Sequence, residues 1–387
     1  MEFDMTSRVI DNIGELVTCD ATLGEGPLGI FRNVALVLVD GIVSAIEPVG
    51  SVWADERIDA EHACVMPAFV DSHTHLVFAG DRANEFVARM AGQPYEAGGI
   101  RVTTDATRQS SIDELRMLTE RRRDEARRHG IGHLEMKSGY GLDVATEERC
   151  CALAAEFTDD ITFLGAHVVP AEYAGRTDDY VHLVCGPMLD ACSEHAKWID
   201  VFCERGAFDA DQSGAVLIAG RSRGLGLRVH ANQLGHGPGV QLAVAMGAAS
   251  ADHCTYLSDD DISALAASNT VATFLPAADF STRQPYPDGR RAIDVGVSIA
   301  LATNCNPGSS YTTSMAFVLA LAVREMGLTY QEAVLAATVG GARALQRTDG
   351  LGTLSPGARA KAVILDAPSA AHIVYRPGVN LVARLLE

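Results

Sequence analysis

An α/β fold, a closed (β/α)₈ TIM-type barrel with a small β-sandwich, is predicted by two features of this 387-residue sequence. Between residues 67 and 346, short apolar segments alternate with amphipathic ones, as is typical of repeated strand–helix units. Outside that range the chain carries only short, turn-bounded β-like segments. We therefore expect a barrel domain over 67–346 and a composite β-sandwich formed by both chain ends, residues 1–66 plus 347–387.

Eight apolar segments predict the barrel strands, and amphipathic segments such as 111–130, 145–157 and 209–224 predict helices between them. The strand segments are 64–73, 132–138, 161–167, 198–204, 226–230, 248–253, 270–276 and 298–304. Eight such units in roughly 250 residues have the size of a closed barrel. A doubly wound open sheet is the alternative, but no GxGxxG motif follows the first strand to support a dinucleotide site.

The two ends of the chain carry turn signals that favour β-structure. In "ALVLVDGIVSAIEP" (35–48), Asp40-Gly41 separates two apolar runs, a strong hairpin signal because both residues accept the positive φ of a tight turn. Near the other end, residues 352–368 and 372–377 again predict a turn followed by short strands. Two such ends could pack into one small sandwich.

Composition limits the partners and the location of this protein. A formal net charge of −19 argues against a nucleic-acid partner, since phosphate binding needs clustered Lys and Arg. Nine cysteines without a CxxC framework indicate reduced thiols. The start "MEFDMTSRVI" lacks the pattern of a signal peptide, and no run of about 18 apolar residues could span a membrane. We expect a cytoplasmic protein with no membrane partner.

Polar residues gather where the predicted strands end, which is where barrel enzymes carry their reactive side chains. Five of the 12 histidines occupy such ends, together with Glu135, Lys137, Tyr140, Glu204 and Asn304. The five are His73, His75, His167, His230 and His253. The alternative for each histidine is a satisfied core or surface residue.

The pair His73 and His75 predicts a metal site. Residues two apart on an extended strand point to the same side, so the two imidazoles form half of a ligand set. His230 is the natural third ligand, and imidazole suits zinc or iron. An open coordination position would leave room for a water nucleophile.

The motifs "DSHTHLVFAGDR", "KSGYGL", "LGAHVVP", "VHAN" with "SADH", and "NPGSS" resemble those of the imidazolonepropionases of the amidohydrolase superfamily. The resemblance covers essentially the whole chain. It implies a metal-dependent barrel enzyme, usually dimeric, with one zinc or iron ion per subunit. It also implies a small anionic heterocyclic substrate, 4-imidazolone-5-propanoate, whose cyclic amide is hydrolysed to N-formimidoyl-L-glutamate in histidine degradation.

The resemblance also implies roles for individual residues. His73, His75 and His230 match metal ligands, and His253 matches a catalytic histidine that helps to activate water or polarise the carbonyl. Gln233 matches a catalytic and substrate-contacting position that is Glu in some members. The remaining substrate contacts are expected from Arg82, Tyr140, His167, Asn306, Gly308 and Ser309. Arg82 offers a bidentate partner for the propanoate, although it could instead pair with Glu85 on the following helix.

Asn304 departs from the family pattern, which has a metal-bound, proton-accepting Asp at the end of the eighth strand. The Asn carbonyl oxygen could still approach a metal, but the amide carries no charge and takes no proton. Three outcomes follow: slow turnover with His253 as base, binding without turnover, or an introduced or erroneous residue in an active enzyme. Rival functions are another cyclic amidase, a nucleobase aminohydrolase, or a catalytically silent metal- and ligand-binding homologue.

Overall fold

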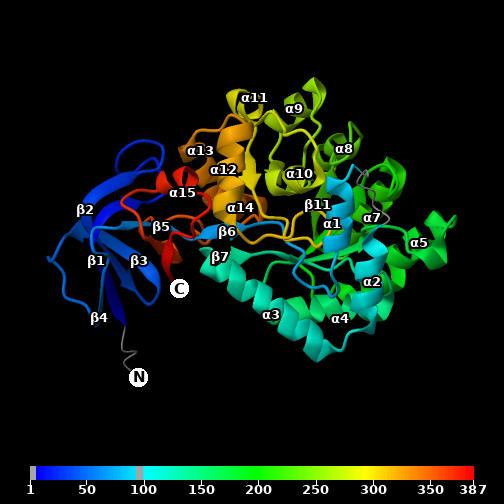
Figure 1. The fold of residues 1–387 in the computed structure, drawn as a ribbon, viewed down its shortest axis with the longest axis horizontal. Helices are drawn as coiled ribbons and strands as arrows, with labels where there is room; N and C mark the ends of the chain where they lie inside the picture. The colour runs from blue at the N-terminus through cyan, green and yellow to red at the C-terminus, as the bar shows by residue number, and fades with distance from the viewer. Residues whose placement is uncertain (1–5, 93–98) are drawn as a thin grey trace. The chain divides into compact units, whose positions relative to one another are not determined.

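The computed structural model describes residues 6–92 and 99–387 and confirms the predicted α/β class (Figure 1). The chain forms two compact units. One holds the residues up to Asp71 together with 126–133 and 314–387, and the other holds 72–125 and 134–313. The domain boundaries predicted at 66/67 and 346/347 stay a prediction. Residues 1–5, part of the segment in which we expected no signal peptide, lie outside the described residues.

Strands from both chain ends form one seven-stranded sheet in the first unit. Its order is β16-β15-β5-β1-β2-β3, and β4 pairs with β1. The ends meet because β15 pairs antiparallel with β5, so the first (blue) and last (red) strands in Figure 1 share a sheet. The strands are β1 (Ser7–Val17), β2 (Ile30–Val39), β3 (Ile42–Pro48), β4 (Glu56–Asp59), β5 (Cys64–Pro67), β15 (Ala362–Leu365) and β16 (Val382–Leu386).

The predicted hairpin is confirmed between β2 and β3. Val39 pairs with Ile42, so Asp40 and Gly41 form a two-residue turn, with φ of 50° and 74°. Positive φ at both positions is the geometry that matches the twist of the flanking strands. One face of the sheet buries an aliphatic cluster that includes Ile10, Leu36 and Ile364.

The first unit also contains a two-stranded sheet and four α-helices. The two strands are β6 (Phe69–Asp71) and β7 (Ile131–Leu134). The helices are α12 (Met315–Glu325), α13 (Tyr330–Leu335), α14 (Gly341–Ala344) and α15 (His372–Tyr375), with a π-helical turn at Ala336–Gly340 before α14.

Seven parallel strands in chain order form the barrel sheet of the second unit, from β8 to β14. Their side chains are almost all buried, as expected for a parallel sheet covered by helices. The strands coincide with the predicted segments: β8 (Met136–Lys137), β9 (Ile161–Ala166), β10 (Trp198–Cys203), β11 (Gly226–Ala231), β12 (Ser250–His253), β13 (Val271–Phe274) and β14 (Ile299–Leu301).

Residues 73 and 74 close this sheet into a ring. The backbone nitrogen of Lys137 donates to the carbonyl of Thr74 (2.9 Å), and that of Asn304 donates to the carbonyl of His73 (3.0 Å). Thr74 also forms a parallel bridge with Asn304. The end of the first predicted strand segment (64–73) therefore lies between the second and the eighth barrel strands, whereas its beginning, Cys64–Pro67, forms β5 in the sheet of the first unit.

Helices follow the strands in the second unit, and acidic or hydroxyl side chains cap several of them. Asp209 and Gln212 form a capping box at the start of α7, close to the predicted start at 209. The helices are α1 (Ala83–Met90), α2 (Ile100–Gln109), α3 (Ile112–Arg128, ending in the other unit), α4 (Val144–Ala154), α5 (Thr177–Leu183), α6 (Leu189–Cys192), α7 (Ala210–Ser222), α8 (Gly239–Ala245), α9 (Asp259–Ala266), α10 (Pro276–Thr282) and α11 (Gly289–Asp294). Short turns at Ala171–Tyr173 (3₁₀) and Val184–Met188 (π) precede α5 and α6. In the described part of the chain, no helix combines the length and apolarity needed to cross a bilayer.

Packing of α7 on β10 predicts the effect of a single methyl group. A Cβ at Gly220 would lie 2.2 Å from Cγ2 of Ile199, so Gly220→Ala should lower the free energy of unfolding by about 1–3 kcal/mol. Gly214→Ala is the matched control on the same helix, because its nearest neighbour, Cδ1 of Leu242, is 4.0 Å away. The control should stabilise by about 0.5–1 kcal/mol. Urea denaturation followed by circular dichroism measures both, and equal stability of the two variants would contradict the packing.

Candidate metal centre and active site

Four of the five strand-end histidines lie at the ends of three strands of the barrel rim. His73 and His75 follow β6, His230 lies in β11, and His253 ends β12. Pairing of β11 with β12 sets Ala231 opposite His253, which brings these two strand ends to one level. All four side chains are at most 2% exposed. The rim therefore holds a cluster of imidazoles away from bulk water.

The Nε2 atoms of three imidazoles face one another at a spacing that suits a metal ion. Nε2 of His75 lies 3.3 Å from Nε2 of His73 and 3.4 Å from Nε2 of His230. A tetrahedral ion with nitrogen ligands at 2.0–2.1 Å separates those nitrogens by roughly 3.3–3.4 Å. The ligand set inferred from the sequence is thus brought together, and its donor atoms fit the ion.

His253 belongs to the same cluster at longer range. Ring nitrogens of His73, His230 and His253 lie within 4.8 Å of one another, a second triad that overlaps the first. The shorter contacts favour His75 over His253 as the third ligand. His253 and the following Cys254 both have left-handed φ, 77° and 51°. Such backbone is costly for these residue types, and it aims the His253 ring where an ordinary strand end would not.

Carboxylates lie beside two of the three candidate ligand imidazoles. Nδ1 of His73 forms a hydrogen bond with Oδ2 of Asp252 (2.7 Å), and Nδ1 of His230 lies 3.0 Å from Oδ2 of Asp200, an ion-pair contact without hydrogen-bond geometry. A carboxylate on the Nδ1 side favours the tautomer whose lone pair is on Nε2, where it is available to a metal. Burial lowers the pKa of His73 and of His75 well below the ordinary range, with nearby positive charge adding to the effect. Both rings are therefore neutral near pH 7, as ligands must be.

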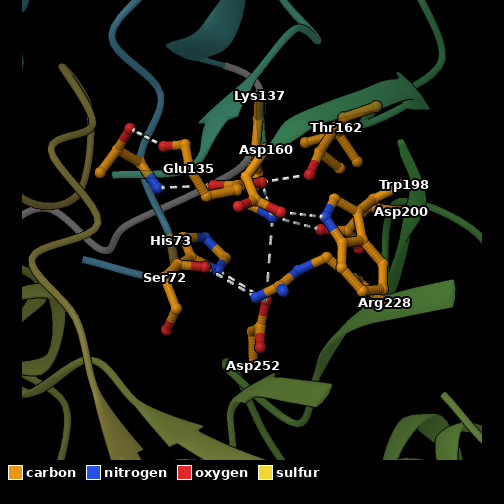
Figure 2. A network of polar contacts seen from close by, with 12 residues as sticks. Ser72, His73, Glu135, Lys137, Asp160, Thr162, Trp198, Asp200, Arg228 and Asp252 are labelled. Carbon is orange, nitrogen blue, oxygen red and sulfur yellow. Dashed lines mark hydrogen bonds and ion pairs between the residues drawn. The ribbon is translucent and has the colours of Figure 1, made fainter. Parts of the chain in front are cut away.

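Beneath the histidines lies a network of five buried charged side chains, drawn in Figure 2. Glu135, Lys137, Asp200, Arg228 and Asp252 are all 0% exposed. Nζ of Lys137 lies 2.9 Å from Glu135 and 2.9 Å from Asp200, while Arg228 lies 3.2 Å from Asp252 and donates to the Ser72 carbonyl (2.7 Å). Three buried acidic groups are thus matched by two buried cations.

The pairing keeps the carboxylates ionised despite their burial. Burial alone would raise the pKa of Asp200, but attraction to His230 and Lys137 outweighs it and the pKa is lowered. For Asp252 the burial effect is likewise overcome, here by Arg228 and Lys137, and the pKa falls. Burial would lower the pKa of Lys137, yet Asp200 and Glu135 raise it. Each group therefore retains its charge because its neighbours retain theirs.

Tyr140 and His167, the predicted substrate contacts, both lie beside His75. The His75 ring centroid is 5.4 Å from that of His167 and 5.9 Å from that of Tyr140. Nδ1 of His167 donates to the carbonyl of Gly139 (2.9 Å), so its Nε2 carries the lone pair. Burial, with the nearby His230, lowers the pKa of His167 to about 3. His167 is therefore a neutral hydrogen-bond acceptor.

Arg82 pairs with Glu85 on α1, the alternative that the i,i+3 spacing allowed. Its Nε and Nη2 atoms each donate to Glu85 at 2.7 Å, a bidentate geometry. Arg89 also contacts Glu85 (3.1 Å) and donates to the carbonyl of Gly308 (2.8 Å). A Cβ at Gly308 would lie 2.1 Å from Nη1 of Arg82, so a larger residue at 308 would require this guanidinium to move.

The loop after β14 has its own internal bonds. The side-chain nitrogen Nδ2 of Asn304 donates to Oγ of Ser309 (2.9 Å). Oδ1 of Asn304 has no hydrogen-bond partner among the described residues. Oδ1 of Asn306 accepts from the backbone nitrogens of Gly308 (2.8 Å) and Ser309 (3.2 Å), so that side chain shapes the loop itself. Asn304 has a φ of 69°, a conformation that Asn tolerates well.

The motifs singled out Gln233, which has no side-chain hydrogen bond among the described residues, and they did not single out two carboxylates that contact the histidine cluster. Gln233 follows β11 and is 5% exposed, and its side chain forms no hydrogen bond with another described residue. Conversely, the motifs assigned no role to Asp200 or Asp252, which hold two of the ligand histidines. Their signal in the sequence is a charged residue inside an apolar strand segment, "WIDVFC" and "SADH".

Comparisons with known proteins agree with this geometry. The model of the amidohydrolase family matches residues 215–383. An imidazolonepropionase of Salinispora arenicola is 63% identical over 386 residues, covering 99% of this chain and 98% of the relative. An imidazolonepropionase of Mycolicibacterium smegmatis is 62% identical over 384 residues, covering 99% and 97%.

Solved structures with low sequence identity share the fold. The atrazine chlorohydrolase of Arthrobacter aurescens TC1, in complex with zinc, superposes with a TM-score of 0.73 at 16% identity, covering 98% of this chain and 93% of that one. A guanine deaminase of C. acetobutylicum with bound guanine has a TM-score of 0.71 at 13% identity, covering 99% and 98%. With its near full-length relatives, this chain belongs to the imidazolonepropionase family of amidohydrolases.

Proposed function

We propose that this protein hydrolyses the cyclic amide of 4-imidazolone-5-propanoate to N-formimidoyl-L-glutamate, a step of histidine catabolism. The single observation that carries the proposal is the trio of Nε2 atoms at 3.3 and 3.4 Å, at the rim of a barrel whose relatives are imidazolonepropionases. In this reaction water adds to the ring carbonyl and the adjacent carbon–nitrogen bond breaks. The freed nitrogen then receives a proton.

His73, His75 and His230 would hold one zinc or iron ion, and Oδ1 of Asn304 is the candidate fourth ligand. The absence of a hydrogen-bond partner for that buried oxygen among the described residues supports this role. A bound ion of this kind lowers the pKa of water and polarises a carbonyl. Imidazole donors suit zinc and iron about equally, so the ligand set leaves the choice between them to metal analysis.

His253 is the side chain best suited to move a proton. Burial lowers its pKa well below the ordinary range, so the ring is neutral near pH 7 and has a nitrogen lone pair that can accept a proton from water. Its centroid lies 5.6 Å from that of His73 and 5.3 Å from that of His230. His167 and Tyr140, on the other side of the cluster, would orient the heterocycle.

Arg82 would bind the propanoate tail in place of, or together with, the carboxylate of Glu85. Glu85 occupies its guanidinium, and Glu85 is the more exposed partner, with 28% of its side chain accessible against 3% for Arg82. A substrate carboxylate would therefore share or replace one partly solvated carboxylate. The backbone of Gly308, against which Arg82 packs, would form the opposite wall, and Asn306, Ser309 and Gln233 would complete the pocket.

We also propose a cytoplasmic homodimer that binds neither nucleic acid nor membrane, as the composition and the family resemblance predict. The formal net charge of −19 supports the first exclusion. Light scattering of the purified protein measures the assembly.

The test of the function is turnover of 4-imidazolone-5-propanoate by this chain and by Asn304→Asp. An aspartate at 304 supplies a proton acceptor, so we expect kcat to rise about 10²- to 10⁴-fold with unchanged metal content. Asn269→Asp, at an exposed position, is the control and should leave kcat unchanged. Absence of turnover in both the natural chain and Asn304→Asp, with metal bound, would overturn the proposed reaction.

Replacement of a ligand histidine should remove the metal. We expect His73→Ala to lose the bound ion, because one of three nitrogen donors is gone and the pairing with Asp252 ends. Elemental analysis of the purified protein measures the metal content. His182→Ala, on the exposed side of α5, should retain a full equivalent. A full equivalent in His73→Ala would remove His73 from the ligand set.

Removal of the Arg82 guanidinium, the cation proposed to bind the propanoate, should weaken substrate binding without affecting metal binding. Arg82→Ala should raise KM about 10- to 100-fold, the value of a lost charge-assisted hydrogen bond, with metal content unchanged. Steady-state kinetics measures KM. The control is Arg116→Ala, which removes a surface guanidinium paired with Glu156. Unchanged KM in Arg82→Ala would exclude Arg82 from the substrate site.

A further inference from the structure

We propose that Lys137 is a positioning residue of the metal site. Its ammonium group holds the Asp200 and Asp252 carboxylates in the places from which they orient His230 and His73. Lys137 touches none of the three ligand histidines in the structure and acts through the two aspartates. The inference rests on the proposed function, because it presumes that the three imidazoles bind a metal ion.

The contacts of Lys137 form a two-step chain to each of two ligands. Nζ lies 2.9 Å from Oδ2 of Asp200 and 3.8 Å from Oδ2 of Asp252. Those same oxygens lie 3.0 Å from Nδ1 of His230 and 2.7 Å from Nδ1 of His73. One ammonium group therefore stands behind two of the three donors, as Figure 2 shows for the His73 branch.

The barrel explains why one lysine can reach both aspartates. In a closed barrel, inward-pointing side chains of alternate strands meet in layers across the axis. Lys137, Asp200 and Asp252 come from β8, β10 and β12, which are alternate strands in the order of the sheet. The "KSGYGL" motif thus contributes a cation to the layer beneath the histidines, in addition to Tyr140 at the rim.

The two branches are not equally supported. Asp252 also has Arg228 at 3.2 Å, and Arg228 is held by the carbonyl of Ser72 (2.7 Å). Asp200 depends on Lys137 for its ion pair, and it also accepts from the backbone nitrogen of His230 (3.1 Å). Loss of Lys137 should therefore disturb the His230 branch more than the His73 branch.

Removal of the ammonium would leave three buried carboxylates facing one guanidinium. Like charges in a dry core repel strongly, so Asp200, Asp252 and Glu135 would move apart or rotate. Each movement turns an imidazole whose Nδ1 the carboxylate holds. Replacement of such outer partners of metal ligands typically costs 10- to 100-fold in metal affinity.

The experiment measures Zn²⁺ affinity of the metal-free full-length protein by competition with a chromophoric chelator. We expect Lys137→Met to weaken Zn²⁺ binding about 10- to 100-fold. Lys197→Met is the matched control, because it removes the same group from a buried aspartate, Asp160 (2.7 Å), that accepts from Nε1 of Trp198 and lies outside the candidate ligand set. The control should keep the affinity of the natural chain.

A second readout separates positioning from stability. The visible bands of bound Co²⁺ report ligand geometry, and we expect them to shift in Lys137→Met and to stay unchanged in Lys197→Met. If Lys137→Met does not fold, Lys137→Gln, which keeps a hydrogen-bond donor without charge, takes its place with the same expectations. Natural Zn²⁺ affinity and unshifted Co²⁺ bands in the Lys137 variant would overturn the proposal, whatever its stability. A folded natural chain that binds no Zn²⁺ would overturn the proposed function as well.

Discussion

Charge pairing among buried side chains inside the barrel is the constraint on which the site depends. Burial of an unpaired carboxylate or ammonium costs several kcal/mol, so the five charged groups at 0% exposure must satisfy one another. Their mutual arrangement leaves Asp200 and Asp252 with an oxygen facing an imidazole. The histidines inherit their orientation from that layer, and the neutral Nε2 atoms converge as a consequence. The positions of the histidines at the rim therefore depend on the buried charged residues beneath them.

Closure of the ring places His73 and His75 beside the strands that carry the buried charges. Residues 73 and 74 exchange backbone hydrogen bonds with both neighbouring staves, so His73 and His75 cannot move independently of Lys137 or Asn304. These backbone hydrogen bonds constrain the rim around the candidate metal ligands without any bound ion. Constraint of this kind lets ligands be held near their working geometry, with little conformational entropy left to lose.

The surroundings of Arg82 follow a different principle. Arg82 is buried, but its partner Glu85 is partly solvated and α1 also carries Arg89. A buried cation that already has a carboxylate partner avoids the cost of being unpaired. In the proposed function, a substrate carboxylate would have to compete with Glu85 for this guanidinium. On a protein of net charge −19, this local pairing matters more than long-range attraction.

The sequence alone determined the fold class, most strand positions and the histidines that gather at the barrel rim, because strand periodicity and strand-end placement are local properties. The spacing of His73 and His75 already put two imidazoles on one side. Only the tertiary structure decided which carboxylates stand behind them, since Lys137, Asp200 and Asp252 meet across the axis of a closed ring. It also decided that Arg82 holds Glu85, a choice that i,i+3 spacing allowed but did not compel. Pairings between distant strands depend on closure and register, and no local pattern of residues encodes those distances.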